Sequence, residues 1–277
     1  LFRSLKSKLL FKISGDYIIN YVYKAASTIK SKKIVCVLNN SSQQLQDFIQ
    51  KNKISSVEQK KPSGTADAVN AALKSLPVNK KNNVLILCGD VPFIEPATLR
   101  KIISKLDNSD MCIGTYVQEN PIGYGRIIRN NKQIIGIIEE KDATEKIKKI
   151  NEINTGIICI NEGVLRKFIG KINNKNIQKE YYLTDIVKLL SDNKYKVSSY
   201  TIKNGLETMG INSKKDLVEI ERKLLIKKAK ALLNKGALIR DVLRTDIKGD
   251  LKVQTDVEID INCIFEDKVT IGSNTTI

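Results

Sequence analysis

Short apolar runs alternate with amphipathic helical patterns along most of this chain, and this alternation restricts its fold more than any other feature. Lys33–Leu38 and Val84–Cys88 are nearly continuous apolar runs, the pattern of strands that are buried on both faces. Asp16–Ile29 and Ala68–Leu76 carry apolar residues three and four positions apart, the spacing of one helix face. The alternation predicts βαβ units and an α/β, Rossmann-like domain with a mostly parallel sheet.

The pattern changes in the second half of the chain. Two strand-like stretches, Arg126–Arg129 and Gln133–Glu139, flank a pair of asparagines and predict a β-hairpin. Ser213–Asn234 predicts a long helix, because its apolar residues keep the helical spacing and lysines gather toward its end. Gly249–Ile277 has no helical period and predicts short strands, the beginning of a repetitive structure.

Composition excludes several classes of protein. No apolar run approaches the roughly 18–20 residues of a membrane-spanning helix, and the first residues do not resemble a signal peptide, so we expect no membrane segment. The five cysteines form no Cys-x-x-Cys pair, which predicts a reducing, cytoplasmic location. The absence of histidine excludes imidazole metal sites and histidine-based catalysis from this stretch.

The net charge of +17 raises the question of nucleic-acid binding. Only 8 of the 47 basic residues are arginine, whereas recognition of bases and phosphates favours arginine. The lysines are also spread along the chain, with few aromatic residues between them. We therefore expect no nucleic-acid partner, and phosphorylated small molecules account for part of the charge.

Two motifs lie where α/β proteins bind ligands. Asp90 follows the apolar run Val84–Cys88 after one glycine, and ligands collect outside the carboxyl ends of such strands. A carboxylate there suits Mg²⁺, although for Asp90 taken in isolation a turn-forming aspartate is the favoured interpretation. Ser63-Gly64-Thr65 precedes a helix. It either offers backbone N–H groups to an anion or forms an ordinary helix N-cap.

Other polar positions allow two interpretations each. Gly123 and Gly125 allow a ligand to approach the backbone, or form a tight turn. Glu139 begins a charged cluster that fits a site or a solvated loop. Asn154 and Asn212 are ligands or turn formers. The order of these motifs along the chain carries more information than any one of them.

In that order, the chain resembles the bacterial bifunctional N-acetylglucosamine-1-phosphate uridylyltransferase / glucosamine-1-phosphate N-acetyltransferase family. The resemblance covers nearly the whole chain. The matching stretches are Gly64–Ala68, Leu87–Pro92, Gly123–Ile127, Ile138–Ala143, Glu152–Gly156, Glu180–Asp185, Gly210–Asn212, Gly236–Asp241 and Val257–Asp260.

The resemblance implies roles for residues of the nucleotide site. Lys8 looks like the lysine that contacts the nucleotide phosphates. Gln59, Gly64 and Thr65 resemble the segment that recognises uracil.

The remaining implied roles concern the metal and the sugar. Asp90 and Asn212 look like the ligands of Mg²⁺, the one expected cofactor. Gly125, Glu139 and Asn154 match positions that bind the N-acetylglucosamine phosphate. We therefore expect Lys8 and Asp90 to be the catalytic residues.

The resemblance also implies a domain organisation. Residues 1–212 form the nucleotidyltransferase domain, 213–235 a linker helix, and 236–277 the first coils of a left-handed parallel β-helix. The full-length parent is expected to form a homotrimer.

The chain departs from the family at three places. Leu1 stands where the family's Gly-rich loop ends in arginine, so that loop and the strand before it precede this chain, and Ser7 replaces a proline. The acetyltransferase site, with its catalytic histidine, is expected beyond Ile277, which agrees with the absence of histidine.

The implied reaction is Mg²⁺-dependent uridylyl transfer from UTP to N-acetylglucosamine 1-phosphate, which releases pyrophosphate. Two alternatives stay open. The chain is a nucleotidyltransferase for another sugar phosphate or nucleotide, or a basic binding module without catalysis.

Overall fold

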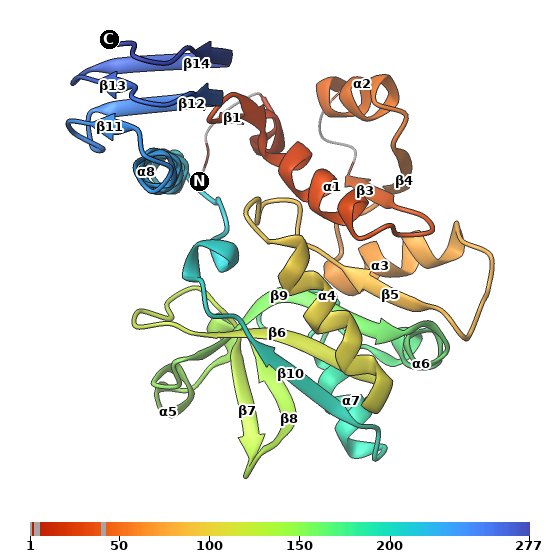
Figure 1. The fold of residues 1–277 in the computed structure, drawn as a ribbon. Helices are drawn as coiled ribbons and strands as arrows, with labels where there is room; N and C mark the ends of the chain where they lie inside the picture. Colours follow the sequence, from red (N-terminus) through yellow and green to blue (C-terminus); the bar gives the residue numbers. More distant parts are fainter. Residues whose placement is uncertain (1, 3–5, 40–42) are drawn as a thin grey trace. The chain divides into compact units, whose positions relative to one another are not determined.

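Both ends of the chain belong to the same structural unit. The computed structural model describes Phe2, residues 6–39 and residues 43–277, so the predicted departure at Leu1 lies outside the described residues. The terminal unit comprises Leu1–Tyr21 and Met209–Ile277, and the core unit comprises Val22–Thr208 (Figure 1). The domain boundaries predicted after residues 212 and 235 separate domains by their function, not by their contacts. These boundaries stay a prediction.

The core unit is built on a six-stranded sheet in which β10, β6, β9, β7 and β8 are neighbours in that order, and β5 also pairs with β9. The hairpin predicted around the two asparagines is confirmed as β7 and β8. The strands are β5 (Asn83–Ile86), β6 (Met111–Val117), β7 (Arg126–Asn130), β8 (Gln133–Ile138), β9 (Glu152–Asn161) and β10 (Val197–Thr201).

The direction of β9 makes this sheet mixed. β9 is antiparallel to β5, β6 and β7, and β8 is antiparallel to β7, whereas β10 is parallel to β6. Four of the six strands therefore share one direction, as predicted, but most of the hydrogen-bonded pairs are antiparallel. The prediction of a mostly parallel sheet needs this correction, because one reversed strand in the middle makes each of its pairings antiparallel.

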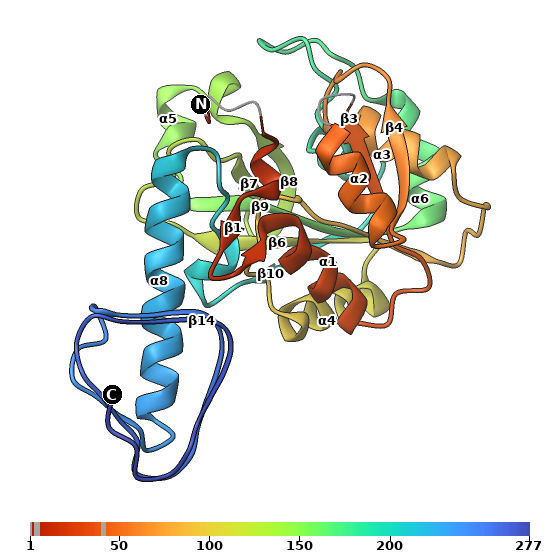
Figure 2. The ribbon, with the colours of Figure 1, turned by 90° about the horizontal axis from the view of Figure 1, so that it is seen from above.

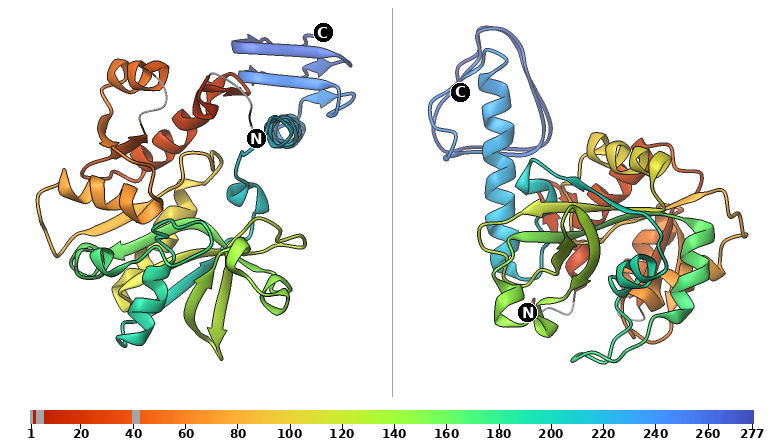
Figure 3. Two further views of the ribbon diagram at one scale, coloured as in Figure 1. Left: turned by 180° about the vertical axis from the view of Figure 1, so that it is seen from behind. Right: turned by 90° about the horizontal axis from the view of Figure 1, so that it is seen from below.

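Both faces of the sheet are covered. Ile113 of β6 and Ile158 of β9 belong to one buried cluster, which includes residues of α3, α6 and α7. Cys112 and Ile157, their neighbours along the chain, belong to a second cluster with residues of α1 and α4. Successive strand residues point to opposite faces, so the sheet separates the two clusters. The right-hand view of Figure 3 shows α4, in yellow, and α7, in blue-green, on opposite sides of the sheet.

A second, two-stranded sheet stands beside α2 and α3. Its strands β3 (Val35–Asn39) and β4 (Ser55–Gln59) are parallel. Val35, Cys36 and Val37 are half-buried rather than buried, unlike the prediction for this run. Among the described residues β3 pairs with β4 alone, so its other edge lacks a neighbouring strand that would cover these side chains.

The helices predicted over Asp16–Ile29, Ala68–Leu76 and Ser213–Asn234 are present as α1, α3 and α8. Pro96 occupies the first turn of α4, where a missing N–H costs nothing. No helix in the described part of the chain is long and apolar enough to cross a lipid bilayer. The helices are α1 (Ile18–Thr28), α2 (Gln43–Lys51), α3 (Thr65–Lys74), α4 (Pro96–Ser104), α5 (Glu145–Lys148), α6 (Glu162–Phe168), α7 (Asp185–Asp192) and α8 (Lys214–Leu233).

The terminal unit joins an N-terminal hairpin to α8 and four later strands. A capping box between Ser213 and Asp216 begins α8, because each residue's side chain bonds the other's backbone N–H. Figure 1 shows α8 beneath β11 and β12, and Figure 2 shows the C-terminal strands as stacked turns of chain. The strands are β1 (Lys12–Ile13), β2 (Asp16–Tyr17), β11 (Leu238–Ile239), β12 (Thr245–Val253), β13 (Glu258–Ile259) and β14 (Cys263–Ile271).

The C-terminal strands pair in parallel with a constant spacing. Thr245 pairs with Cys263 and Val253 with Ile271, so partners in β12 and β14 stand 18 residues apart throughout. Their inward side chains join Ala229 and Leu232 of α8 in one buried cluster. The repetition predicted for this stretch is thus present as one turn of chain stacked on the next.

Candidate functional site

Three of the predicted sugar-site residues meet beside the β7–β8 hairpin. Gly125 precedes β7, Glu139 follows β8, and Asn154 lies in β9, whose residue Ile153 pairs with Arg126. The backbone N–H of Asn154 donates to the Gly125 carbonyl at 2.8 Å. A Cβ atom on Gly125 would stand 3.1 Å from Glu139 Oε2, so the carboxylate lies directly against the glycine backbone.

The Glu139 carboxyl is half-buried and hydrogen-bonded. Thr184, immediately before α7, donates from Oγ1 to Glu139 Oε1 at 2.8 Å. Burial raises the pKa of Glu139 above its usual value; the Thr184 hydroxyl opposes this shift, and the charges of Asp185 and Asp142 add to it. The solvated-loop interpretation is therefore wrong for Glu139 itself, which is set into the structure as an acceptor.

Arg126 fixes the loop that contains Gly125. Its side chain is 1% exposed and forms an ion pair of 2.6 Å with Glu140. It also donates to the carbonyls of Tyr124 and Lys148. Arg126 and Thr184 belong to motifs that resemble the family, but sequence reasoning assigned neither a role, because a buried arginine and a buried threonine have no local signature.

The predicted uracil-site residues meet where β4 ends and α3 begins. Gln59 is buried and donates from Nε2 to the Gly64 carbonyl at 3.1 Å and to Asp67 Oδ2 at 2.8 Å. Gly64 has φ +123°, and a Cβ atom there would stand 2.5 Å from the Tyr181 carbonyl oxygen. Gly64 occupies the N-cap position without a side-chain cap, and only glycine fits this conformation and contact.

One segment of chain links the two groups of residues. The backbone N–H of Leu183 donates to Thr65 Oγ1 at 2.9 Å, and that of Tyr181 donates to the Ser63 carbonyl at 2.8 Å. The next residue along, Thr184, bonds Glu139. The stretch Glu180–Asp185 therefore joins the predicted sugar and uracil positions within the core unit, and its motif was the sequence signal for this role.

Lys8 and Asn212 meet within the terminal unit. Lys8 opens a short 3₁₀ helix, and its Nζ donates to Asn212 Oδ1 at 3.1 Å across 204 residues of sequence. The Asn212 backbone N–H donates to Asp216 Oδ2 at 2.9 Å, which ties it to the N-terminus of α8. The structure thus brings these two predicted site residues together, and their roles stay predictions.

Asp90 follows β5 in the core unit. A Cβ atom on Gly156 of β9 would stand 2.7 Å from Cys88 Sγ, so the chain just before Asp90 lies beside the stretch that contains Asn154. The Val91 backbone N–H donates to the Cys88 carbonyl at 3.3 Å, which makes a turn at this strand end. The turn interpretation therefore holds for the backbone, and the role of the Asp90 carboxylate as a metal ligand stays a prediction.

The donor atoms of Asp90 and Asn212 fit Mg²⁺. Carboxylate and amide oxygens are the ligands this cation takes, with phosphate oxygens completing its shell. No group of three or more His, Cys, Asp or Glu residues that would hold a metal occurs in the described residues. Asp90 lies in the core unit and Asn212 in the terminal unit, and their joint role as metal ligands stays a prediction.

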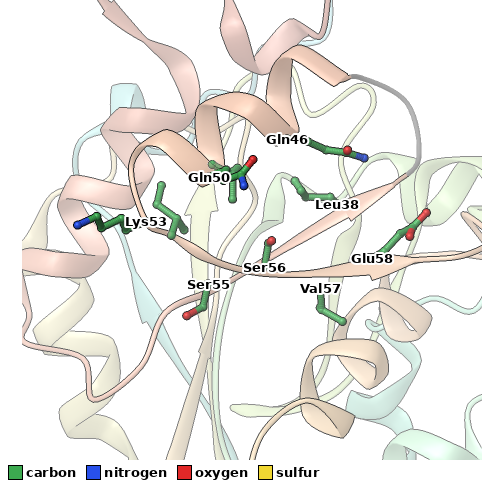
Figure 4. A pocket seen from close by; sticks show the side chains of 10 residues that line it. Leu38, Gln46, Gln50, Lys53, Ser55, Ser56, Val57 and Glu58 are labelled. Atoms are coloured by element: carbon green, nitrogen blue, oxygen red, sulfur yellow. The ribbon is translucent and has the colours of Figure 1, made fainter.

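A pocket of about 590 Å³ lies elsewhere, between α2 and β4 (Figure 4). It contains none of the predicted site residues. Its lining consists of Leu38, Gln46, Ile49, Gln50, Lys53, Ile54, Ser55, Ser56, Val57 and Glu58. The candidate site is therefore defined by the hydrogen-bonded groups described above rather than by this pocket.

Comparison with known proteins identifies relatives of this chain. The nucleotidyl transferase family model matches residues 1–225. A protein of Marinobacter nauticus named bifunctional protein GlmU is 33% identical over 276 residues, and one of the same name from Vesicomyosocius okutanii is 38% identical over 275. Each alignment covers 99% of this chain and 60% of the relative, so the chain spans about 60% of the length of these curated relatives.

A solved structure shares the fold. The UDP-glucose pyrophosphorylase of Acinetobacter baumannii superposes with a TM-score of 0.57 at 17% identity, over 82% of this chain and 91% of that one. At this level of identity the similarity concerns the fold alone. The α/β, Rossmann-like architecture predicted from the sequence is thus confirmed by an independent structure.

Proposed function

Because this chain belongs to the nucleotidyl transferase family, we propose that it transfers uridylyl from UTP to N-acetylglucosamine 1-phosphate and releases pyrophosphate. The observation that carries the proposal is the convergence of Gly125, Glu139 and Asn154 beside β7, joined through Thr184 to the Gln59 and Gly64 group. Relatives named bifunctional protein GlmU support the choice of reaction.

The proposed reaction needs no histidine. The sugar phosphate is a dianion and attacks the α-phosphate of UTP in line, so the main demand is to offset the repulsion between two anions. Lys8 supplies a positive charge at the nucleotide phosphates. Asp90 and Asn212 would hold Mg²⁺, which would supply Lewis-acid chemistry to the phosphate oxygens.

Loading of the site changes one contact seen here. Asn212 Oδ1 accepts the Lys8 hydrogen bond in this structure. If that oxygen held a metal ion, the Lys8 ammonium would be released to the phosphates, whose charged oxygens are stronger acceptors than an amide. The contact thus keeps the lysine close to its working position before the substrates arrive.

The core-unit residues recognise the two substrates. Glu139, partly removed from water, accepts a hydrogen bond from the sugar, and the Asn154 amide binds beside it. Gly125 has no side chain to obstruct the sugar phosphate. Gln59, held by Gly64 and Asp67, presents its amide to uracil.

We also propose that residues 236–277 begin a left-handed parallel β-helix. The parallel pairing of β12 with β14 and the spacing of 18 residues support it, because each turn of chain stacks directly on the next. In the longer protein this domain would trimerise and hold an acetyltransferase site, and the protein would work in the cytoplasm.

Pyrophosphate release from UTP, N-acetylglucosamine 1-phosphate and Mg²⁺ tests the proposal directly. The chain is compared with a version extended by the N-terminal strand and Gly-rich loop of the family it resembles. We expect release by the extended version, dependent on Mg²⁺ and on both substrates.

The substrate panel separates the alternatives. Release with another sugar phosphate or nucleoside triphosphate alone would contradict the substrate choice and favour another nucleotidyltransferase. No release by a folded extended version, together with salt-sensitive binding of nucleic acid, would favour the basic binding module.

A further inference from the structure

A turn near the N-terminus is held to the C-terminal part of the terminal unit by one lysine. Ser14, between β1 and β2, is 3% exposed and has φ +47°. Lys228, in α8, donates from Nζ to Ser14 Oγ at 2.5 Å, to the Gly249 carbonyl at 2.8 Å and to the Ile247 carbonyl at 3.2 Å. An ammonium group has three N–H donors, so each has an acceptor here.

The same turn makes further contacts with α8 and β12. The Ser14 backbone N–H donates to Glu221 Oε1 at 2.7 Å, and its Oγ donates to the Ile247 carbonyl at 2.8 Å. A Cβ atom on Gly15 would stand 2.6 Å from the Lys248 carbonyl oxygen. The turn is therefore fitted closely to one helix and one strand from the other end of the chain.

The turn belongs to the segment that carries Lys8. The 3₁₀ helix that begins at Lys8 runs into β1, and the Ile18 backbone N–H donates to the Phe11 carbonyl at 3.0 Å, which closes the hairpin. We propose that Lys228 is a positioning residue for nucleotidyl transfer, because by holding Ser14 against α8 and β12 it fixes the segment that presents Lys8. This inference rests on the proposed function.

Removal of the lysine has a clear local cost. The carbonyls of Ile247 and Gly249 would each lose a charged donor, and the Ser14 hydroxyl would lose the donor that it accepts from. Burial lowers the pKa of Lys228, and the nearby charges of Asp250 and Glu221 oppose this shift. The hydrogen bonds of Lys228 described above reach the turn at Ser14, so its effect on Lys8 is expected to pass through the hairpin.

Hydrogen exchange of the whole chain tests the positioning itself. We expect Lys228→Met to speed exchange in residues 8–17 by about tenfold, the usual worth of a hydrogen bond to a charged group, with the core unit unchanged. Lys230→Met is the matched control, because Lys230 lies on the same helix and is exposed. Unchanged exchange in Lys228→Met would overturn the proposal.

Binding of UTP with Mg²⁺ tests the consequence for the site. We expect the dissociation constant of UTP to rise about tenfold in Lys228→Met, Lys228→Arg to recover part of the loss, and the KM for the sugar phosphate to stay constant wherever turnover is measurable. Faster exchange with unchanged UTP binding would show a merely structural role and also overturn the proposal.

Two provisions keep the test decisive. Should Lys228→Met fail to fold, Ser14→Ala removes only the hydroxyl and is expected to shift both measurements in the same direction. Failure of the wild-type protein to bind UTP would count against the proposed function instead, and the exchange result would then decide whether Lys228 holds the hairpin.

Discussion

Thr184 Oγ1 donates a hydrogen bond of 2.8 Å to Glu139 Oε1 across 45 residues of sequence. Burial raises the pKa of this carboxyl, and the bond opposes that shift because it stabilises the ionised form. The contact joins the start of α7 to the end of β8, so packing of the core unit and the charge of Glu139 depend on one another.

Loss of this bond should move the pH dependence of substrate binding. Thr184→Val keeps the shape and removes the donor, so the pKa of Glu139 rises further and the carboxylate protonates at higher pH. As pH falls, we expect the KM for N-acetylglucosamine 1-phosphate to increase in both proteins. In Thr184→Val this increase should begin at a higher pH than in the wild type. Thr184→Ser retains the hydroxyl and serves as the control; identical pH profiles for all three proteins would contradict the assignment.

Glu139→Gln should lower the activity and raise the stability of the folded protein. The pKa of Glu139 is raised on folding, so folding disfavours its ionised form at neutral pH, and this cost disappears as pH falls through the folded pKa toward the usual 4.5. We expect the melting temperature at pH 7.5 to rise, because the neutral amide carries no charge that burial disfavours. The gain over wild type should shrink toward pH 4.5, and a gain independent of pH would point to packing instead.

Lys8→Ala should reduce turnover severely. Removal of one preorganised electrostatic contact typically costs about 10²–10³ in rate. The measurement is kcat for pyrophosphate release, made in the version of the protein that is active. Lys12→Ala, an exposed lysine of the same hairpin, is the control and should keep its rate. Equal losses in the two variants would indicate a general charge effect.

Asp90→Ala should abolish the dependence on Mg²⁺ together with the activity. We expect a loss at least as large as for Lys8→Ala, because a metal ligand and its charge are both removed. Titration with Mg²⁺ measures the effect in the purified variant. A variant that keeps more than a tenth of wild-type turnover would exclude Asp90 as a metal ligand.

The elements of the fold were predictable from the sequence, but the direction of β9 was not. Apolar spacing located α1, α3, α8 and the β7–β8 hairpin, since local periodicity reflects which residues are buried. The apolar spacing of a strand is the same whichever direction the strand runs in the sheet. The reversal of β9, which makes the sheet mixed, depends on contacts with distant strands and has no local signal.

The site was predictable only through the resemblance. Glu139 within a charged cluster and Asn212 beside a helix start have ordinary local explanations. Their significance lies in partners far along the chain, Thr184 for one and Lys8 for the other. Thr184 and Lys228 were missed because a single threonine or lysine gives no pattern until the fold supplies its acceptors.

The terminal unit contains residues from both ends of the chain, and this determines the order in which its parts assemble during synthesis. Ser14 leaves the ribosome 233 residues before Ile247, the residue whose carbonyl it bonds. The core unit lies between them, so it can collapse while the N-terminal hairpin still lacks its partners. The core unit of a nascent chain can therefore fold early. The segment that contains Lys8 is held in place only after α8 and β12 have emerged.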